Sequence, residues 1–280
     1  MRLASFSHAG RAAYGAVVEG GVVDLSRRLG GVYPSLRAAI AGGALPLMQP
    51  LAEEPPDVPM ADIALDLPIP DPVKIICVGR NYKAHVAEGN LKLPETPSIF
   101  LRTLESFAPP GQALVRPLIS EKFDYEGELA VIIGRPGRHI RKEAALGNLF
   151  GYTCLNDGSI RDYQFTHSLT VGKNFFHSGS IGPWIVTADE IPDPTRLFLR
   201  TRLNGVEVQH TGTDGMIFDI PTIVSYVSAF IPLDAGDVIA TGTPEGVGFA
   251  REPPLWMKAG DEIAVEISGI GVLRNSVIDE

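Results

Sequence analysis

The chain has 280 residues, of which 30 are Gly and 23 are Pro. Each Gly costs a helix interior about 1 kcal/mol and each Pro about 3 kcal/mol relative to Ala, so this content excludes a protein built of long helices. The formal net charge is -9 and the basic residues are scattered, which argues against a nucleic-acid partner. No apolar run reaches the roughly 18 residues of a membrane span, so we expect a cytoplasmic protein without a membrane partner.

The chain divides into a short N-terminal part and a longer remainder. Short apolar runs alternate with Gly at the start of the chain and predict a hairpin with its turn at Glu19–Gly21. A short amphipathic helix is expected over Pro34–Ala41. Residues 51–72, LAEEPPDVPMADIALDLPIPDP, are rich in Pro and favour an extended connection. We therefore expect a small N-terminal α+β domain over residues 1–70 and a large domain over residues 71–280.

From residue 73 onward the pattern is typical of many short strands and few helices. The run VKIICV predicts a buried strand over residues 73–78, and Gly79 follows it as a sharp exit. The other predicted elements are strands over 128–133, 148–155, 184–187, 197–203, 238–241 and 263–267, and helices after Asn156 and over 220–229. Cys77 and Cys154 form no CxxC pair, so we expect two buried free thiols. The pattern predicts a mixed, β-rich α+β fold.

The strongest local signal is DYEGELAVIIG, residues 124–134. Alternate residues of a strand share a face, so Asp124, Glu126 and Glu128 are expected on one side. On an exposed strand this would be an ordinary solvated edge. Here the strand runs on into the apolar AVIIG, so its carboxylates are expected near the core, where they repel one another unless a cation neutralises them. Oxygen ligands alone favour Mg²⁺ or Mn²⁺ over zinc.

A further carboxylate follows the next strand, in GYTCLNDGSIRDYQ. If Asp157 opens a helix there, Asp157, Arg161 and Gln164 share one helical face. An N-cap with an i+4 ion pair is an equally weighted interpretation of the same residues. Together with Lys173 in TVGKNF, these side chains predict a site for an anionic, oxygen-rich ligand.

The segment GRNYKAHVAEG, residues 79–89, places His85 and Glu88 three residues apart, which makes them neighbours on one helical turn. A carboxylate beside an imidazole orients the ring and raises its basicity, as in a base that activates water. Spacing alone favours an ordinary surface turn with an incidental His and Glu. Gly89 and the loop to Pro97 would allow the turn to close as a lid.

A Gly-rich segment, TGTPEGVG, covers residues 241–248. It lacks the GK[ST] ending of a P-loop and the GxGxxG order of a dinucleotide site, so nucleotide binding is weakly supported. A nest of backbone N–H groups that grips a carboxylate is the other interpretation.

Taken in order, the motifs CVGRNYKAHVAE, DYEGELAVIIG, GYTCLNDGSIRDYQ, VGKNF, IGPW and TGTPEGVG resemble the fumarylacetoacetate hydrolase family, including its acylpyruvase and oxaloacetate decarboxylase branches. The resemblance covers roughly residues 73–278. It implies a rolled β-sandwich catalytic domain with few helices, a small domain before it, and a homodimer.

The resemblance also implies roles for individual residues. Glu126, Glu128 and Asp157 would hold Mg²⁺ or Mn²⁺, and His85 with Glu88 would form a water-activating pair on a mobile lid. Lys173 would act in catalysis by holding the oxo-acid end of the substrate. The implied substrate-binding residues are Arg80, Arg161, Gln164 and Thr243, the last of them facing the substrate carboxylate.

The implied activity is hydrolysis of a carbon–carbon bond in a 2,4-dioxo acid through a metal-stabilised enolate. The substrate would be an acylpyruvate or a fumarylacetoacetate-like compound, sugar-derived dioxo acids included. Decarboxylation of oxaloacetate and isomerisation or decarboxylation of a hydroxy-dienedioate are alternatives in the same site. A catalytically silent scaffold that binds an oxo acid is the alternative from another class. Four residues differ from those usual at the same positions in acylpyruvases: Gly158, Ile160, Asn174 and His177. The identity of the substrate's acyl chain therefore stays open.

Overall fold

The computed structural model describes residues 1–90 and 92–280. The strands are β1 (Arg2–His8), β2 (Arg11–Val18), β3 (Gly21–Asp24), β4 (Val58–Pro59), β5 (Ala64–Leu65), β6 (Ile75–Gly79), β7 (Ser98–Arg102), β8 (Phe107–Ala108), β9 (Leu114–Arg116), β10 (Phe123–Asp124), β11 (Gly127–Ile133), β12 (Leu149–Asn156), β13 (Ser159–Ile160), β14 (Gly179–Thr187), β15 (Phe198–Leu203), β16 (Val206–Gly212), β17 (Val238–Ala240), β18 (Glu262–Ile267) and β19 (Gly271–Asp279). The α-helices are α1 (Leu25–Leu29), α2 (Leu36–Ala41), α3 (Leu45–Leu51), α4 (Lys83–Glu88), α5 (Arg161–Thr166), α6 (Leu169–Lys173) and α7 (Ile220–Ser228).

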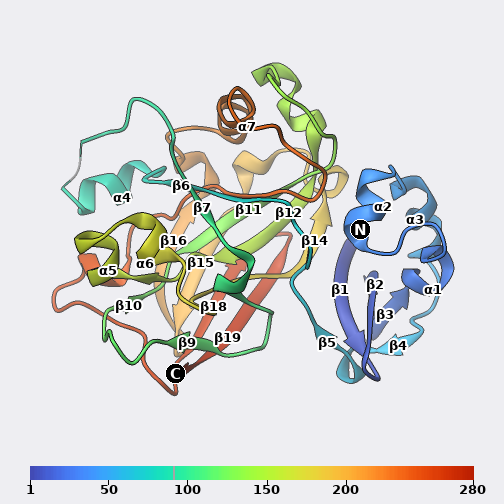
Figure 1. Cartoon of the computed structure of the whole chain (residues 1–280), viewed down its shortest axis with the longest axis horizontal. Coiled ribbons are helices and arrows are strands. Elements are labelled where there is room, and N and C mark those ends of the chain that lie inside the picture. Colours follow the sequence, from blue (N-terminus) through green and yellow to red (C-terminus); the bar gives the residue numbers. More distant parts are fainter. Residues whose placement is uncertain (91) are drawn as a thin grey trace.

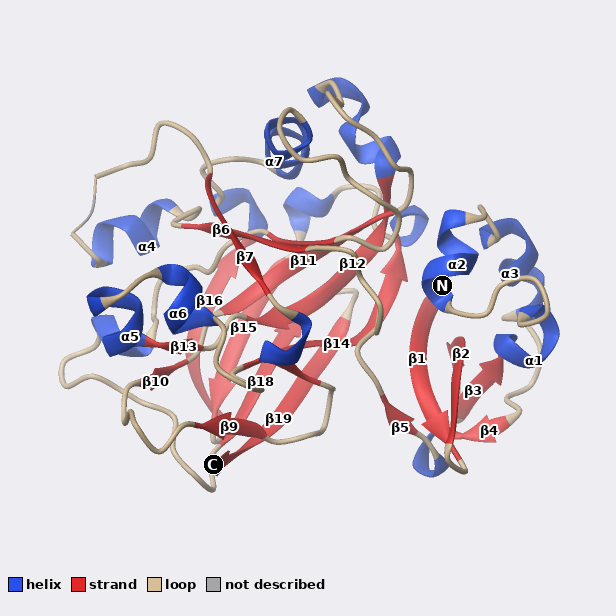
Figure 2. Cartoon of the chain, in the orientation of Figure 1, coloured by secondary structure: helices blue, strands red, loops and turns tan. Residues whose placement is uncertain are grey.

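Short helices and many strands confirm the β-rich mixed fold predicted from the Gly and Pro content. Figure 2 shows strands through the body of the molecule, with α4, α5 and α6 gathered on its left side. A large sheet has the order β4-β3-β2-β1-β14-β12-β11-β17-β6-β7, and a second sheet has the order β16-β15-β18-β19-β9. In the described residues no helix is both long and apolar enough to cross a membrane.

The N-terminal part forms a three-stranded antiparallel meander with α1, α2 and α3 beside it, drawn in blue in Figure 1. The predicted hairpin is confirmed as β2 and β3, and the helix predicted over Pro34–Ala41 is α2. The segment 51–72 is extended in β4 and β5, which pair with β3 and β1, but it also contains a 3₁₀ turn over Met60–Asp62. Pairing of β1 with β14 continues the main sheet into this part. A domain boundary near residue 70 stays a prediction.

The core lies on both faces of the large sheet, because β11 is buried along its whole length. Ala130 and Ile132 pack with the N-terminal part, whereas Leu129, Val131 and Ile133 pack with α7 and the five-stranded sheet. This two-sided burial is what a sandwich requires. The seven strands predicted from residue 73 onward match β6, β11, β12, β14, β15, β17 and β18, and the helix predicted over 220–229 is α7. Both cysteines are buried and free, as predicted.

Candidate active site

Strand register brings together segments that are far apart in the sequence. Gly127, at the start of β11, pairs with Asn156, at the end of the antiparallel β12. Glu126 and Glu128 therefore flank a position directly beside Asp157. On the other side β17 pairs with β11, so that the Gly-rich loop after β17 begins next to Glu128.

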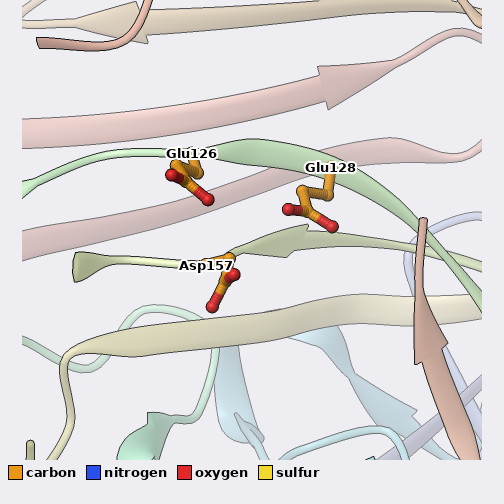
Figure 3. A group of neighbouring side chains, drawn as sticks. All are labelled: Glu126, Glu128 and Asp157. Atoms are coloured by element: carbon orange, nitrogen blue, oxygen red, sulfur yellow. The ribbon is translucent and has the colours of Figure 1, made fainter. Parts of the chain in front are cut away.

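The three carboxylates of Glu126, Glu128 and Asp157 lie close together (Figure 3), and an oxygen of each lies within 4.8 Å of the others. All three side chains are buried. Strand alternation thus predicted the two glutamates correctly, although β11 itself begins at Gly127. Asp124 does not join the cluster and pairs instead with Arg161.

Cationic side chains contact this cluster from two sides. Lys173 Nζ lies 2.6 Å from Glu126 Oε2 and 2.7 Å from Asp157 Oδ2, and it also donates to the Asp157 carbonyl at 3.0 Å. Those contacts use all three protons of the ammonium group. Arg161 Nη2 lies 2.6 Å from Glu126 Oε1, close enough for an ion pair but not aligned as a hydrogen bond.

Burial and neighbouring charges shift the pKa values of Glu126 and Glu128 in opposite directions. Burial alone would raise the pKa of Glu126, but the charges of Lys173 and Arg161 outweigh it and lower this pKa to about 2. Burial, followed by the negative charges of Asp157 and Glu126, raises the pKa of Glu128 well above its ordinary value. Burial would lower the pKa of Lys173, but Asp157 and Glu126 raise it. Like-charge repulsion is therefore concentrated on Glu128.

The donor set fits a divalent cation. The buried charged groups around the cluster are the acids Asp124, Glu126, Glu128 and Asp157 and the bases Arg102, Arg161 and Lys173. With every acid ionised, one negative charge remains, and a divalent ion would convert it to one positive charge. The Lys173 ammonium, which bridges Glu126 and Asp157, already shows that this position binds positive charge. Three carboxylates without sulfur or imidazole suit Mg²⁺ or Mn²⁺.

The cluster lies in the wall of a cavity of about 340 Å³. The predicted site residues that line this cavity are Arg80, His85, Glu126, Glu128, Asp157, Arg161, Gln164, Lys173 and Thr243. Glu88 does not line the cavity but contacts His85 Nδ1. Apolar side chains, among them Phe100, Phe165 and Phe249, form other parts of the wall. The volume is suited to a small organic molecule.

His85 and Glu88 are neighbours on one helical turn, as their spacing predicted, and they contact each other, which differs from the incidental surface pair that spacing alone favoured. Both lie on α4, and His85 Nδ1 is 2.9 Å from Glu88 Oε1. The second oxygen of Glu88 accepts from the Gly246 N–H at 2.8 Å. The carboxylate therefore fixes the ring and ties α4 to the Gly-rich loop. The lid predicted for the loop from Gly89 to Pro97 falls partly on residue 91, which lies outside the described residues.

The helix after Asn156 begins at Arg161 with Ile160 as its N-cap, so Asp157 neither opens nor caps it, and both interpretations of Asp157 at a helix start are wrong. Asp157 lies between β12 and β13, because the two residues before Arg161 pair with β10. Asp157, Arg161 and Gln164 still meet at the cavity, but by a turn and a helix and not by one helical face. Arg161 donates to Asp124 Oδ2 at 2.7 Å and to Gln164 Oε1 at 2.9 Å.

Backbone N–H groups of the Gly-rich loop bind carboxylates, as one interpretation of its sequence proposed. The carboxylates are the protein's own: Gly242 donates to Glu128 at 2.7 Å, Gly246 to Glu88, and Gly248 to Asp124 at 2.7 Å. Gly242 has φ of +103°, a conformation that suits glycine. The loop therefore holds together parts of the site that come from separate segments.

Sequence reasoning missed Arg102, whose Nη1 donates to Asp157 Oδ1 at 2.6 Å. A signal was present in SIFLR, because Ser98, Phe100 and Arg102 alternate along β7 and the first two line the cavity. An arginine on the cavity side of an apolar strand indicates a buried anionic partner.

Fold and site together define a β-rich protein with a small-molecule cavity, a carboxylate cluster able to hold a divalent cation, and a histidine–glutamate pair beside it. The profile of the family described as fumarylacetoacetate (FAA) hydrolase C-terminal matches residues 74–278. The chain belongs to the fumarylacetoacetate hydrolase family of enzymes, which confirms the resemblance seen in the sequence.

Relatives and solved structures agree with this family. The chain is 36% identical over 266 residues to oxaloacetate tautomerase Fahd2a of Rattus norvegicus, which is mitochondrial, covering 93% of this chain and 85% of that protein. Identity to the mitochondrial human oxaloacetate tautomerase FAHD2A is 38%, over 81% of this chain and 74% of that protein. The prediction of a cytoplasmic protein is contradicted by these mitochondrial relatives.

Two solved structures align over the whole chain. Fumarylacetoacetate hydrolase from Exiguobacterium antarcticum matches with a TM-score of 0.85 and 36% identity, covering 100% of both chains. Maleylpyruvate hydrolase from Sphingobium sp. SYK-6, in complex with manganese(II) ion and pyruvate, matches with a TM-score of 0.81 and 30% identity, covering 100% of this chain and 99% of that one.

Proposed function

We propose that the chain hydrolyses the bond between carbons 3 and 4 of a 2,4-dioxo acid. The observation that carries this proposal is the position of His85, whose ring lines the cavity of the carboxylate cluster while Glu88 holds its Nδ1 at 2.9 Å. A base placed in this way can act on a water or a carbon acid beside the cluster.

Glu126, Glu128 and Asp157 are proposed to hold Mg²⁺ or Mn²⁺. Such an ion supplies Lewis-acid stabilisation of enolate charge on a 2-oxo acid when it is bound. Support comes from the convergence of the three carboxylates and from the manganese complex of the maleylpyruvate hydrolase.

His85 is proposed to remove the proton from the attacking water. Because the ionised Glu88 accepts a hydrogen bond, it favours the tautomer with the proton on Nδ1, which leaves Nε2 as the acceptor. Glu88 also stabilises the imidazolium that forms when His85 takes the proton. The products would be pyruvate, or a substituted pyruvate, and a carboxylic acid.

Lys173, Arg161 and Gln164 are proposed to hold the oxo-acid end of the substrate. All three protons of Lys173 are donated to Glu126 and Asp157, so the ammonium group must release one of these acceptors before it can contact a substrate oxygen. A cation that takes over part of the carboxylate charge would permit that exchange. Thr243 lies in the same wall and is proposed as a further contact.

Oxaloacetate is the second candidate substrate, with tautomerisation or decarboxylation as the reaction. The rat and human relatives are oxaloacetate tautomerases, and the cavity offers a group for a second carboxylate. Arg80 lines the cavity in a left-handed conformation with φ of 57°, and no described carboxylate pairs with it. Its neighbour Asn81 is anchored by hydrogen bonds to Phe218 and Thr241, which fixes the direction of this turn.

The test is a comparison of acetylpyruvate, maleylpyruvate and oxaloacetate with protein loaded with Mg²⁺ or Mn²⁺. Pyruvate release from acetylpyruvate and maleylpyruvate supports hydrolysis. If the protein hydrolyses neither compound but removes the enol absorbance of oxaloacetate, the proposed hydrolase activity is refuted in favour of tautomerisation. Arg80→Gln should raise KM for oxaloacetate and leave KM for acetylpyruvate unchanged. We also propose a homodimer, on the family resemblance alone, and light scattering would test it.

A further inference from the structure

Arg102 is a buried base that no step proposed above uses. Its side chain is 0% exposed, and the side chain of its partner Asp157 is 1% exposed. A charge buried to this extent is costly unless every donor is matched. The partners of the guanidinium therefore decide what the residue does.

Every donor of the guanidinium has an acceptor. The group has five N–H bonds in a fixed plane. Nε donates to Ser106 Oγ at 3.1 Å, and Nη2 donates to the Ser106 carbonyl at 3.1 Å and to Ser178 Oγ at 2.8 Å. Nη1 donates to Asp157 Oδ1 at 2.6 Å and to the Gly158 carbonyl at 3.2 Å. The guanidinium thus joins three separate segments and has no donor left for a ligand.

The surroundings leave the guanidinium no second position. The Phe107 ring lies with its centroid 4.2 Å from Arg102 Cζ. A Cβ at Gly179 would come within 2.8 Å of Nη1, so the chain has glycine where the guanidinium passes. A side chain fixed in this way can fix the group that it contacts, which is the Asp157 carboxylate.

The two oxygens of Asp157 have different partners. Arg102 holds Oδ1, whereas Oδ2 shares the Lys173 ammonium with Glu126. Oδ2 is therefore the oxygen on the side of the glutamates. Glu128 is restrained in a similar way, because the Gly242 N–H binds its Oε2.

We propose that Arg102 is a positioning residue that leaves Asp157 one oxygen for a cation and so makes the cluster select a small divalent ion over Ca²⁺. Ca²⁺ takes six to eight oxygen ligands and often binds a carboxylate through both oxygens, whereas Mg²⁺ takes six at shorter distance. A cluster whose aspartate offers one oxygen disfavours the larger ion. This role depends on the cation site of the proposed function.

The test compares wild type with Arg102→Met, which removes charge and donors, and Arg102→Lys, which keeps the charge but not the fork. Calorimetry gives the dissociation constants for Mg²⁺, Mn²⁺ and Ca²⁺, and electron paramagnetic resonance follows bound Mn²⁺. Arg102→Lys should weaken Mg²⁺ and Mn²⁺ binding about 10- to 100-fold, the range for residues that orient metal ligands. Arg102→Met also removes a positive charge, which favours all three divalent ions alike, so the ratio of their dissociation constants is the quantity compared for that variant. Ca²⁺ binding should hold or tighten because Oδ1 becomes available, so the preference shifts toward Ca²⁺ by roughly tenfold or more.

Arg202→Met is the matched control, since Arg202 pairs with Glu266 at 2.6 Å on the five-stranded sheet. It should leave all three dissociation constants unchanged. Equal weakening of the three ions in the Arg102 variants would overturn the selective role, as would a lowered Tm with unchanged binding constants. Arg102→Lys keeps the test decisive if Arg102→Met does not fold. Failure of the wild type to bind any of the ions would instead refute the cation site itself.

Discussion

Glu88→Gln tests the His85–Glu88 pair, the proposed general base, while leaving the carboxylate cluster intact. The Glu88 carboxylate accepts from two donors, His85 Nδ1 at 2.9 Å and the Gly246 N–H at 2.8 Å. A glutamine has a single acceptor oxygen, and its NH₂ group can only donate. If the amide nitrogen faces the Gly246 N–H, two donors meet. If it faces His85 Nδ1, the ring has to carry its proton on Nε2 to accept from it, and Nε2 can then no longer act as the base. Negative charge beside the imidazole is lost as well.

The expected loss follows from both effects. A positioned base contributes about 10²- to 10⁴-fold to a rate, and the substitution leaves the ring in place but without its oriented partner. We expect kcat to fall about 10²- to 10³-fold, which is roughly 2.7–4.1 kcal/mol at 1.36 kcal/mol per tenfold change. The dissociation constant for Mn²⁺ should stay within about twofold, because Glu88 contacts none of the three clustered carboxylates.

Pyruvate release from the best substrate measures kcat, and calorimetry with Mn²⁺ measures cation binding in the same preparations. Glu95→Gln is the control, since Glu95 follows the same helix, is 88% exposed and, among the described residues, pairs with Lys92 alone. It should change neither quantity. A Glu88→Gln protein that loses Mn²⁺ in step with its activity would refute the assignment of Glu88 to the base.

Three further predictions concern stability and reactivity. Gly242→Ala should lower the free energy of unfolding in urea by about 1–3 kcal/mol more than Gly260→Ala. Both glycines have positive φ, but an added Cβ would lie 2.7 Å from Asn81 Cβ at Gly242 and would meet nothing at Gly260; equal losses would contradict this. Burial raises the pKa of Cys154 to about 12, so the native protein should not react with a thiol reagent near pH 8 until it is unfolded. The hydrogen bond from Arg28 lowers the pKa of Asp57, so Arg28→Met should cost up to about 1 kcal/mol at pH 7 and less once Asp57 is protonated at lower pH. A part of the loss should remain in acid, because Arg28 also donates to the Asp24 carbonyl at 3.0 Å; a loss that does not shrink at all would contradict the role of Asp57.

The sign of the Arg28 effect follows from linkage. A carboxyl whose folded-state pKa is lowered contributes stability above its unfolded pKa and loses it as pH falls through the folded-state value. The difference between wild type and Arg28→Met should therefore shrink below pH 3.8. Urea unfolding at several pH values measures it.

The strands could be predicted because each is a local pattern. Runs such as IICV and AVII are buried on both faces, and the turn at Gly20 separates two apolar runs. The start of α5 could not be predicted in this way, because Ser159 and Ile160 pair with β10, more than thirty residues earlier. That pairing is a long-range contact, and it overrides the local preference of Asp157 for a helix N-terminus.

The site was predictable where one motif carries a whole contact. His85 and Glu88 share a helical turn, and Glu126 and Glu128 are two residues apart in an extended segment, so that their side chains are on the same face. The partners of Arg102 were not predictable, since they lie after β12 and before β14, and only the folded sheets bring them together. Partners in a buried ion pair have no required sequence spacing.

The Gly-rich loop shows how a correct interpretation can still assign the wrong group. Its N–H donors at Gly242, Gly246 and Gly248 are taken by Glu128, Glu88 and Asp124. Thr243 remains as the loop residue in the cavity wall, but its hydroxyl donates its single proton to the Gly127 carbonyl at 3.0 Å.

A carboxylate can only accept hydrogen bonds, so it gains nothing from the Thr243 hydroxyl unless that proton leaves Gly127. The hydroxyl also accepts from Gln209 Nε2 at 2.9 Å, which fixes its orientation further. Among the described residues, no acceptor is bonded to the Thr243 backbone N–H. The backbone N–H is therefore the group that Thr243 itself could offer to a ligand carboxylate, whereas its side chain holds the loop against β11.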